Sequence, residues 1–246
     1  MKTNATITLL IIIMQCLTPG IALSQEDAVS ILKKMDETVL AIKDKSATVE
    51  MQMINLNNGK TKTKKAMLYQ KGLTHKLFRY TYPKGDSGIT SLNIPGAVYL
   101  YMPMFKKPKK VTNMAQSNAF NKTDFSLKDA NTKPYSEQYI PKLLNSNENN
   151  YVLELTPKDK ENSYDHLIVT INKQHFYPEK IEYFANGQKI KEANYQYVKI
   201  GKQWVSSSVS MKNIKKNHET KFIMTNIKIN SGLSDDLFKV ENMVQN

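Results

Sequence analysis

Short stretches in which polar and apolar residues alternate run through most of this sequence, with turn signals between them. Over residues 46–53, Ala47, Val49, Met51 and Met53 alternate with polar side chains. A period of two predicts a half-buried β-strand. Further stretches of this kind raise the expected number of strands to about ten or eleven: Thr61–Lys71, Thr74–Tyr82, Gly88–Ile94, Ala97–Met102, Tyr151–Thr156, His166–Ile171, Glu179–Phe184, Lys189–Ile200, Trp204–Ile214 and Glu219–Ile229.

The turns between these stretches predict that consecutive strands pair antiparallel. Asn57–Lys60, Pro95-Gly96, Asn186-Gly187 and Gly201-Lys202 each separate two strands by only a few residues. Asn and Gly tolerate the positive φ angles that tight hairpins need. The sequence has no alternation of strands with helices and no glycine-rich nucleotide-binding pattern. A meander that curls into a barrel, an open barrel or a sandwich is therefore expected.

One helix is expected ahead of the strands, over Glu26–Lys43. Its apolar residues recur every three or four positions, at Val29, Leu32, Met35, Val39 and Ile42. That spacing places them on a single face, which a helix buries against a core.

The middle of the chain interrupts the pattern. Pro103 and Pro108 keep the lysine-rich segment 105–110 out of a central strand, because proline cannot donate to a ladder of hydrogen bonds. Residues 113–147 are polar and are expected to form loops with one or two short helices, for example Ser136–Leu144.

The N-terminus has the layout of a signal peptide. Lys2 precedes an apolar stretch over Ile7–Met14, and Ala22-Leu23-Ser24 forms a small-residue cleavage site. We expect cleavage after Ser24, which makes residues 1–24 a signal peptide and 25–246 a single exported domain in the periplasm. Two alternatives are an uncleaved anchor, although the stretch is shorter than the roughly 20 residues of a membrane span, and lipidation at Cys16, whose preceding Gln15 is atypical of a lipobox.

The mature chain contains no cysteine, so no disulfide or cysteine metal site is possible. The full chain carries a formal net charge of +13. Anionic lipid, polysaccharide or nucleic acid could each attract such a protein. Arg79 is its arginine and the other basic residues are lysines, whereas base and phosphate recognition favour arginine. We therefore expect no nucleic-acid partner.

No group of residues indicates catalysis or a cofactor. Gly85-Asp86-Ser87-Gly88 resembles a serine-protease motif, but His75 has no surrounding sequence typical of a catalytic base, so we interpret the motif as a turn. The histidines at 75, 166, 175 and 218 form no zinc-binding spacing. The expectation is a non-enzymatic protein with no cofactor and no metal.

The strands instead carry many apolar residues, on both faces. Phe78 and Tyr80 alternate on one strand, and on another Val98, Leu100 and Met102 alternate with tyrosines. A sheet that covers one core needs only one apolar face. The second face is expected either to lie beneath the N-terminal helix or to line a cavity.

Three segments resemble a known family. Lys76–Pro83 (KLFRYTYP) followed by Val98–Pro103 (VYLYMP) is similar to the paired strands of LolA-like outer-membrane lipoprotein-sorting proteins. Phe120–Asp129 resembles the family's F-x-G-S-D-F-S-x-x-D segment, with Lys122 and Thr123 in place of Gly and Ser. The ending, with Trp204 opening a strand and Leu237-Phe238 after the last one, also resembles the family.

The resemblance implies a mainly β (α+β) fold, in which a curved antiparallel sheet forms an open half-barrel covered by the N-terminal helix and short lid helices. It also implies a periplasmic carrier that binds the acyl chains of lipoproteins or lipids and moves them toward the outer membrane. Its partners would be acylated cargo, and possible further partners are an inner-membrane transporter and an outer-membrane acceptor. The expected lipid-binding cavity, beneath the N-terminal helix, is lined by Met51, Met53, Phe78, Tyr80, Leu100 and Met102.

Two alternatives to this function stay open. Relatives in this branch are often linked with export pumps for hydrophobic cargo, so the chain could be a non-enzymatic accessory protein of such a pump. It could also be a polysaccharide-binding module, in which Trp204 and the tyrosines stack on sugars.

Overall fold

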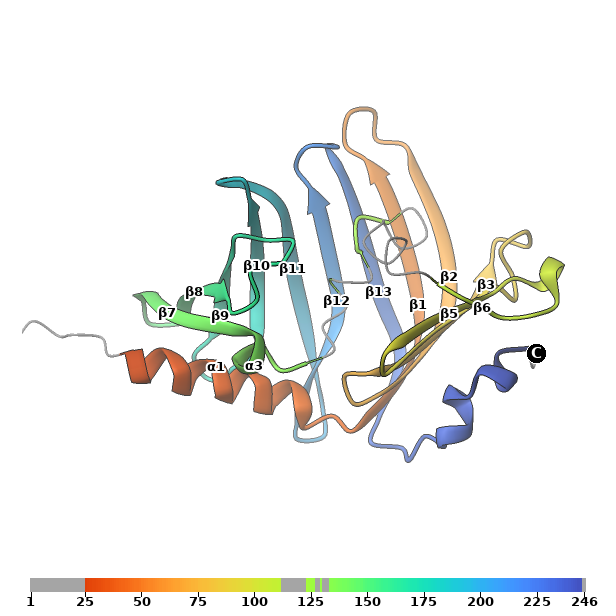
Figure 1. The fold of residues 1–246 in the computed structure, drawn as a ribbon, viewed down its shortest axis with the longest axis horizontal. Coiled ribbons are helices and arrows are strands. Elements are labelled where there is room, and N and C mark those ends of the chain that lie inside the picture. Colours follow the sequence, from red (N-terminus) through yellow and green to blue (C-terminus); the bar gives the residue numbers. More distant parts are fainter. Residues whose placement is uncertain (1–24, 112–122, 127–128, 130–132, 245–246) are drawn as a thin grey trace, which may run out of the picture.

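The computed structural model describes residues 25–111, 123–126, 129 and 133–244 (Figure 1). The predicted signal peptide and its cleavage site after Ser24 lie outside these residues. Helix α1 spans Gln25–Leu40 and precedes the sheet. Among the helices of the described ranges, none is long and apolar enough to cross a membrane.

The described strands form one antiparallel sheet of thirteen, in the order β6-β5-β4-β3-β2-β1-β13-β12-β11-β10-β9-β8-β7. The strands of the first half are β1 (Asp44–Asn55), β2 (Thr61–Lys71), β3 (His75–Tyr82), β4 (Thr90–Ile94), β5 (Ala97–Tyr101) and β6 (Lys109–Lys110). Those of the second half are β7 (Tyr139–Ser146), β8 (Asn150–Pro157), β9 (His166–Asn172), β10 (Pro178–Ala185), β11 (Gln188–Ile200), β12 (Gln203–Asn213) and β13 (His218–Ile229).

Each half is a meander, and the pairing of β1 with β13 joins the two in the middle of the sheet. Hairpins follow the predicted turns: Asn186 and Gly187, between β10 and β11, both have positive φ, at 52° and 70°. The sheet is strongly curved and does not close, because β6 and β7 remain as separate edges. The predicted open, mainly β half-barrel is confirmed.

The eleven predicted strands are all present, and the two additional ones lie at the edges. The predicted helix Ser136–Leu144 is wrong: helix α3 covers only Tyr135–Gln138, and β7 follows it directly. Along β7, Tyr139 and Pro141 are buried while Ile140 and Lys142 are exposed, so this segment has the period of a strand. Pro141 is compatible with it because β7 is an edge strand.

Helix α1 covers the inner face of the second half of the sheet, where the larger core lies (Figure 1). Its Ala28, Ile31, Leu32 and Met35 are buried against residues of β7–β12, including Leu153, Leu155, Val169, Ile171, Ile181 and Met211. The apolar stripe of the helix therefore matches the alternate residues that these strands turn inward.

The outer face of the first half is covered by the C-terminal segment. Two 3₁₀ helices, η3 (Asp235–Phe238) and η4 (Val240–Val244), bury Phe238 and Met243 against Leu77 and Leu92. This contact explains why strands β3–β5 are apolar on both faces. One face turns inward, and the C-terminal segment, rather than α1, covers the other.

Candidate functional site

A cavity of about 340 Å³ opens on the inner face of the sheet, between the two halves and the end of α1. Strands β1–β4 and β10–β13 all contribute side chains to it. Its apolar lining comprises Val39, Leu40, Ile42, Val49, Leu68, Leu73, Phe78, Phe125, Pro178, Ile181, Val205, Val209, Phe222 and Met224. A concave, mostly apolar pocket with a few polar groups is the usual form of a ligand site.

Three phenylalanines from distant parts of the chain meet at this cavity. Phe125 stacks on Phe222 of β13, with ring centroids 4.7 Å apart. The ring of Phe78, on β3, lies 6.3 Å from that of Phe222. All three line the cavity, so the two halves of the sheet share one apolar wall.

A second wall is aromatic and belongs to the β10–β12 half. Tyr177 stacks on Tyr197 at 4.0 Å and also contacts Trp204, whose ring lies 4.8 Å from that of His175. Burial raises the pKa of Tyr195 to about 12 and that of Tyr197 well above its ordinary value. These phenols therefore stay neutral and add no charge to the cavity.

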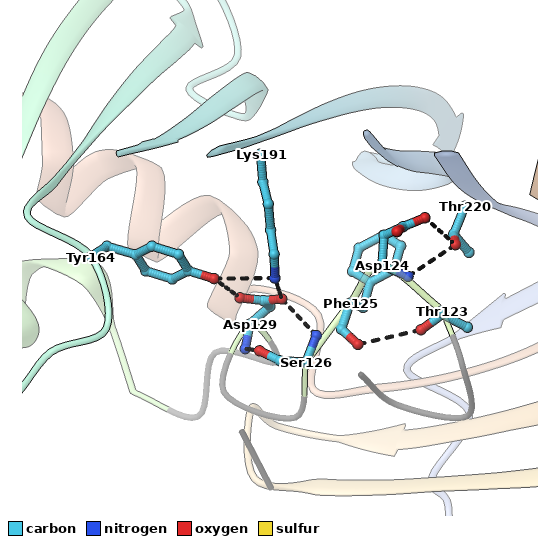
Figure 2. Close-up of polar contacts among 8 residues, drawn as sticks. All are labelled: Thr123, Asp124, Phe125, Ser126, Asp129, Tyr164, Lys191 and Thr220. Atoms are coloured by element: carbon cyan, nitrogen blue, oxygen red, sulfur yellow. Dashed lines mark hydrogen bonds and ion pairs between the residues drawn. The ribbon is translucent and has the colours of Figure 1, made fainter. Parts of the chain in front are cut away.

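Residues 123–126 and 129 are here called the strap, and Phe125, Ser126 and Asp129 line the cavity. Figure 2 shows the polar contacts of the strap. At the β13 end, the Asp124 backbone N–H donates to the Thr220 hydroxyl at 3.0 Å, and that hydroxyl donates to the Asp124 carboxylate at 2.8 Å. The same carboxylate lies 2.5 Å from Nδ1 of His218.

A second buried carboxylate holds the other end of the strap. Asp129 accepts hydrogen bonds from the Ser126 backbone N–H at 2.6 Å, from Lys191 of β11 at 2.9 Å and from the Tyr164 hydroxyl (Figure 2). Its side chain is 1% exposed. A buried carboxylate needs such partners, because an unpaired buried charge is strongly unfavourable. Asp124 and Asp129 of the predicted family motif therefore fasten the strap to two places in the second half of the sheet, β13 and β11.

Replacing the Thr220 hydroxyl tests this fastening. We expect Thr220→Val, which keeps the shape of the side chain, to lower the free energy of unfolding by about 1–3 kcal/mol, because it removes a hydrogen-bond partner from the buried backbone N–H and from the buried carboxylate of Asp124. Urea unfolding measures the change. The matched control is Thr225→Val on the exposed part of the same strand, where a change within about 0.5 kcal/mol is expected. Equal losses in both variants would contradict this role of Thr220.

Polar side chains form one row at the α1 end of the cavity. The register pairs Lys45 with Gln70, Gln70 with Lys76, and Lys76 with Asn93, across β1 to β4, and all four line the cavity. Burial lowers the pKa of Lys45 to about 8; burial and the charge of Lys45 lower the pKa of Lys76 to about 8. Both lysines therefore remain largely protonated at pH 7.

The structure separates the six predicted cavity residues into different roles. Phe78 lines the cavity. Met51 and Tyr80 are buried in a cluster with Val49, Ala66 and Leu68. Met53 is buried on the same strand as Met51. Leu100 lies on the inner face, because it pairs with Ser91, which in turn pairs with Phe78. Met102 follows β5 and is half-buried.

The predicted helix does not lie over these residues. Helix α1 packs against the second half of the sheet, and only its C-terminal part, with Val39 and Leu40, reaches the cavity. Sequence reasoning missed the contribution of β10–β13, because nothing local in the sequence says that β1 pairs with β13. The aromatic residues Tyr195, Tyr197 and Trp204 were the available signal, but their partners across the sheet were unknown.

The cluster of Thr220, Asp124 and His218 on the inner face is not arranged for nucleophilic catalysis by the hydroxyl. The Thr220 hydroxyl donates to Asp124 rather than to His218, so the imidazole does not activate it. Gly85–Gly88 forms a turn in which the backbone N–H groups of Asp86 and Ser87 donate to the Pro83 carbonyl, as predicted. In the part of the chain covered by the structure, no group of three His, Cys, Asp or Glu residues could hold a metal ion.

Solved structures with the same fold cover nearly the whole of this chain. A domain described as that of an outer membrane lipoprotein-sorting protein from Vibrio parahaemolyticus has a TM-score of 0.80 and 20% identity, over 90% of this chain and 100% of its own. A DUF1329 family protein from Desulfovibrio piger has a TM-score of 0.78 and 19% identity, over 89% of this chain and 98% of its own. A LolA superfamily protein from Nitrosomonas europaea has a TM-score of 0.70 and 21% identity, over 87% of this chain and 98% of its own.

A protein-family model, described only as an uncharacterized-protein-like family, matches residues 72–245. The chain belongs to this family, and its fold is LolA-like. The predicted resemblance to LolA-like proteins is thereby confirmed. No curated protein matches the sequence. Because these LolA-like structures are about one-fifth identical in sequence, they define the fold, and the function has to be argued from the cavity.

Proposed function

We propose that this chain is a periplasmic carrier that takes acyl chains of a lipoprotein or lipid into the cavity and moves them toward the outer membrane. The observation that carries the proposal is the apolar cavity between the two halves of an open LolA-like sheet. Burial of each acyl CH₂ contributes about 0.8 kcal/mol. Such binding needs an apolar wall and no catalytic step, so the proposed function is not enzymatic.

The partners follow from the same proposal. Cargo would be an acylated lipoprotein or a lipid, received from an inner-membrane transporter and passed to an outer-membrane acceptor. An accessory role for a hydrophobic-cargo export pump would use the same cavity. The polysaccharide-binding alternative is less well supported, because Tyr177, Tyr197 and Trp204 contact one another instead of presenting separate flat surfaces to a sugar.

Trp204 provides a direct assay of the proposal. It is the single tryptophan of the sequence, and it lines the cavity. Titration with 1-dodecanol, a neutral single-chain amphiphile, is expected to give a saturable change in its fluorescence with one ligand per chain. A fluorescence signal that does not saturate, or does not change, would contradict an acyl-binding cavity.

The loop after β5 is where such a carrier would meet a membrane. Its 3₁₀ helix η1 (Pro103–Phe105) leaves Met104 78% exposed and Phe105 46% exposed. Lys106, Lys107, Lys109 and Lys110 follow directly. Apolar side chains beside a lysine cluster are typical of contact with an anionic lipid surface.

We expect Met104→Ser to weaken binding to phosphatidylglycerol-containing vesicles by about tenfold, since the side chain would no longer enter the lipid. Vesicle co-sedimentation measures the change. Leu144→Ser is the matched control, because Leu144 is an exposed apolar residue on the opposite edge strand, β7. An equal loss in the control, or no vesicle binding by the parent protein, would contradict this docking loop.

A further inference from the structure

The polar row at the α1 end of the cavity places two ammonium groups in a mostly apolar site. Lys45 on β1 and Lys76 on β3 flank Gln70, their common neighbour on β2. All three side chains are half-buried and line the cavity. A carrier for purely apolar cargo would gain nothing from two cations there, since burying a charge is unfavourable.

Other partners already hold the two carboxylates that line the same cavity. Asp36 accepts hydrogen bonds from the backbone N–H groups of Tyr135 and Ser136, both at 2.8 Å. Asp129 is bound by Lys191, Ser126 and Tyr164. The two carboxylates therefore serve to fasten α3 and the strap.

The two lysines also disfavour one another. Burial and the charge of Lys45 lower the pKa of Lys76. The fold therefore disfavours the protonated form of Lys76. An anion between the two ammonium groups would raise the pKa values of both lysines, because a charge of opposite sign stabilises the protonated form.

The apolar part of the cavity begins one step further along the same strands. On β2, Leu68 lies two residues from Gln70, on the same face of the sheet. Phe78 of β3 pairs with Leu68, and both line the cavity. Beyond them lie Val49 and Phe222. The site is therefore amphipathic along its length, with a cationic end and an apolar end.

We propose that Lys45 and Lys76 bind the anionic head of a single-chain amphiphile, with a carboxylate or phosphate between their ammonium groups and its acyl chain lying along Leu68, Phe78 and Phe222. This assignment rests on the proposed function, because it needs the cavity to accept an acyl chain. It adds the charge of the cargo, which the apolar walls alone do not specify.

A pair of ligands with the same chain separates the two proposals. Dodecanoate and 1-dodecanol differ in their head groups, and the fluorescence of Trp204 reports both at pH 7. We expect the parent protein to bind dodecanoate at least about tenfold more tightly than dodecanol, which is the usual effect of a hydrogen bond to a charged group. Dodecyl phosphate is expected to show the same preference, whereas inorganic phosphate, which lacks the chain, is expected to bind far more weakly.

The double variant Lys45→Met/Lys76→Met is expected to lose this preference and to keep its affinity for dodecanol. Lys228→Met removes a charge from an exposed position on the neighbouring strand β13, next to Ser46 of β1, and is expected to keep the preference. Circular dichroism checks that each variant is folded.

Each outcome decides between the proposals. Equal affinity of the parent for dodecanoate and dodecanol would overturn the lysine-pair site while leaving the apolar carrier intact. A preference that persists in the double variant, or disappears in Lys228→Met, would also overturn it. Binding of none of these amphiphiles would overturn the proposed function itself, and the lysine-pair site with it.

Discussion

Val209→Trp is expected to weaken acyl-chain binding roughly 100-fold while the protein remains folded. Val209 lies on β12 in the middle of the inner face, where it pairs with Tyr195 on one side and Phe222 on the other, and it lines the cavity. An indole at this position would occupy space that the ligand needs. Displacing about four CH₂ groups removes about 3 kcal/mol of binding, which is roughly 100-fold in affinity.

The adjacent residue provides the control for this variant. Ser210 points to the opposite face, beside Asn194 and Lys221. Ser210→Trp therefore adds the same volume outside the cavity and is expected to leave the affinity for dodecanol unchanged. If Val209→Trp binds dodecanol as the parent does, the acyl chain does not occupy this cavity. If it unfolds, the space is too small for an indole, and the cavity is a packing defect instead of a ligand site.

Met51→Ala and Phe78→Ala are expected to separate core from cavity wall. Met51 is fully buried, with 0% of its surface exposed, and does not line the cavity. Its truncation is expected to cost about 2–5 kcal/mol of unfolding free energy without changing the dodecanol affinity of the folded protein. Phe78 is half-buried and lines the cavity. Its truncation is expected to cost clearly less stability and to weaken dodecanol binding about tenfold or more.

Urea unfolding and the Trp204 titration on the same two proteins measure both quantities. The expected pattern is a crossed one: the larger stability loss belongs to Met51→Ala and the larger affinity loss to Phe78→Ala. A stability loss for Phe78→Ala of about 3–5 kcal/mol, the usual cost of truncating a core phenylalanine, with no change in binding, would mean that Phe78 is ordinary core.

The strands of this fold were predictable because their signals are local. Alternation over residues 46–53 and the Asn186-Gly187 turn act within a few residues, and the structure has the strand and the hairpin at those places. The edge strand β7 was not predictable in the same way. Its alternating burial depends on contact with β8 and α1, and Pro141 in its middle argues against a strand until the strand is known to be at an edge.

The candidate site was harder to predict than the fold, since it is built from contacts between distant segments. Phe78 was identified from the apolar character of its strand, but its neighbour Phe222 follows it by more than a hundred residues. Lys45 precedes the predicted strand, and nothing in the local sequence distinguishes it from a surface lysine. Only the register of β1, β2 and β3 reveals that it shares the cavity with Lys76. The pairing of β1 with β13, which creates the cavity, has no local signature.

The second apolar face of β3–β5 was expected to lie beneath the N-terminal helix or to line a cavity, and the structure does not place the helix over it. The inner face, with Phe78, contributes to a cavity. The outer face, with Leu77 and Leu92, is covered by Phe238 and Met243 of the C-terminal segment. Sequence periodicity could not predict this cover, because a 3₁₀ segment of four or five residues is too short to display a period.

The most direct test of the central claim is the position of a bound acyl chain in a crystal of the protein grown with 12-bromododecanoate. The account predicts an anomalous bromine peak at the apolar end of the cavity, among Phe78, Val209 and Phe222, with the carboxylate of the same molecule between Lys45 and Lys76. A cavity without a bromine peak, in crystals where the ligand binds elsewhere on the protein or not at all, would contradict the claim that this protein carries acyl chains in its cavity.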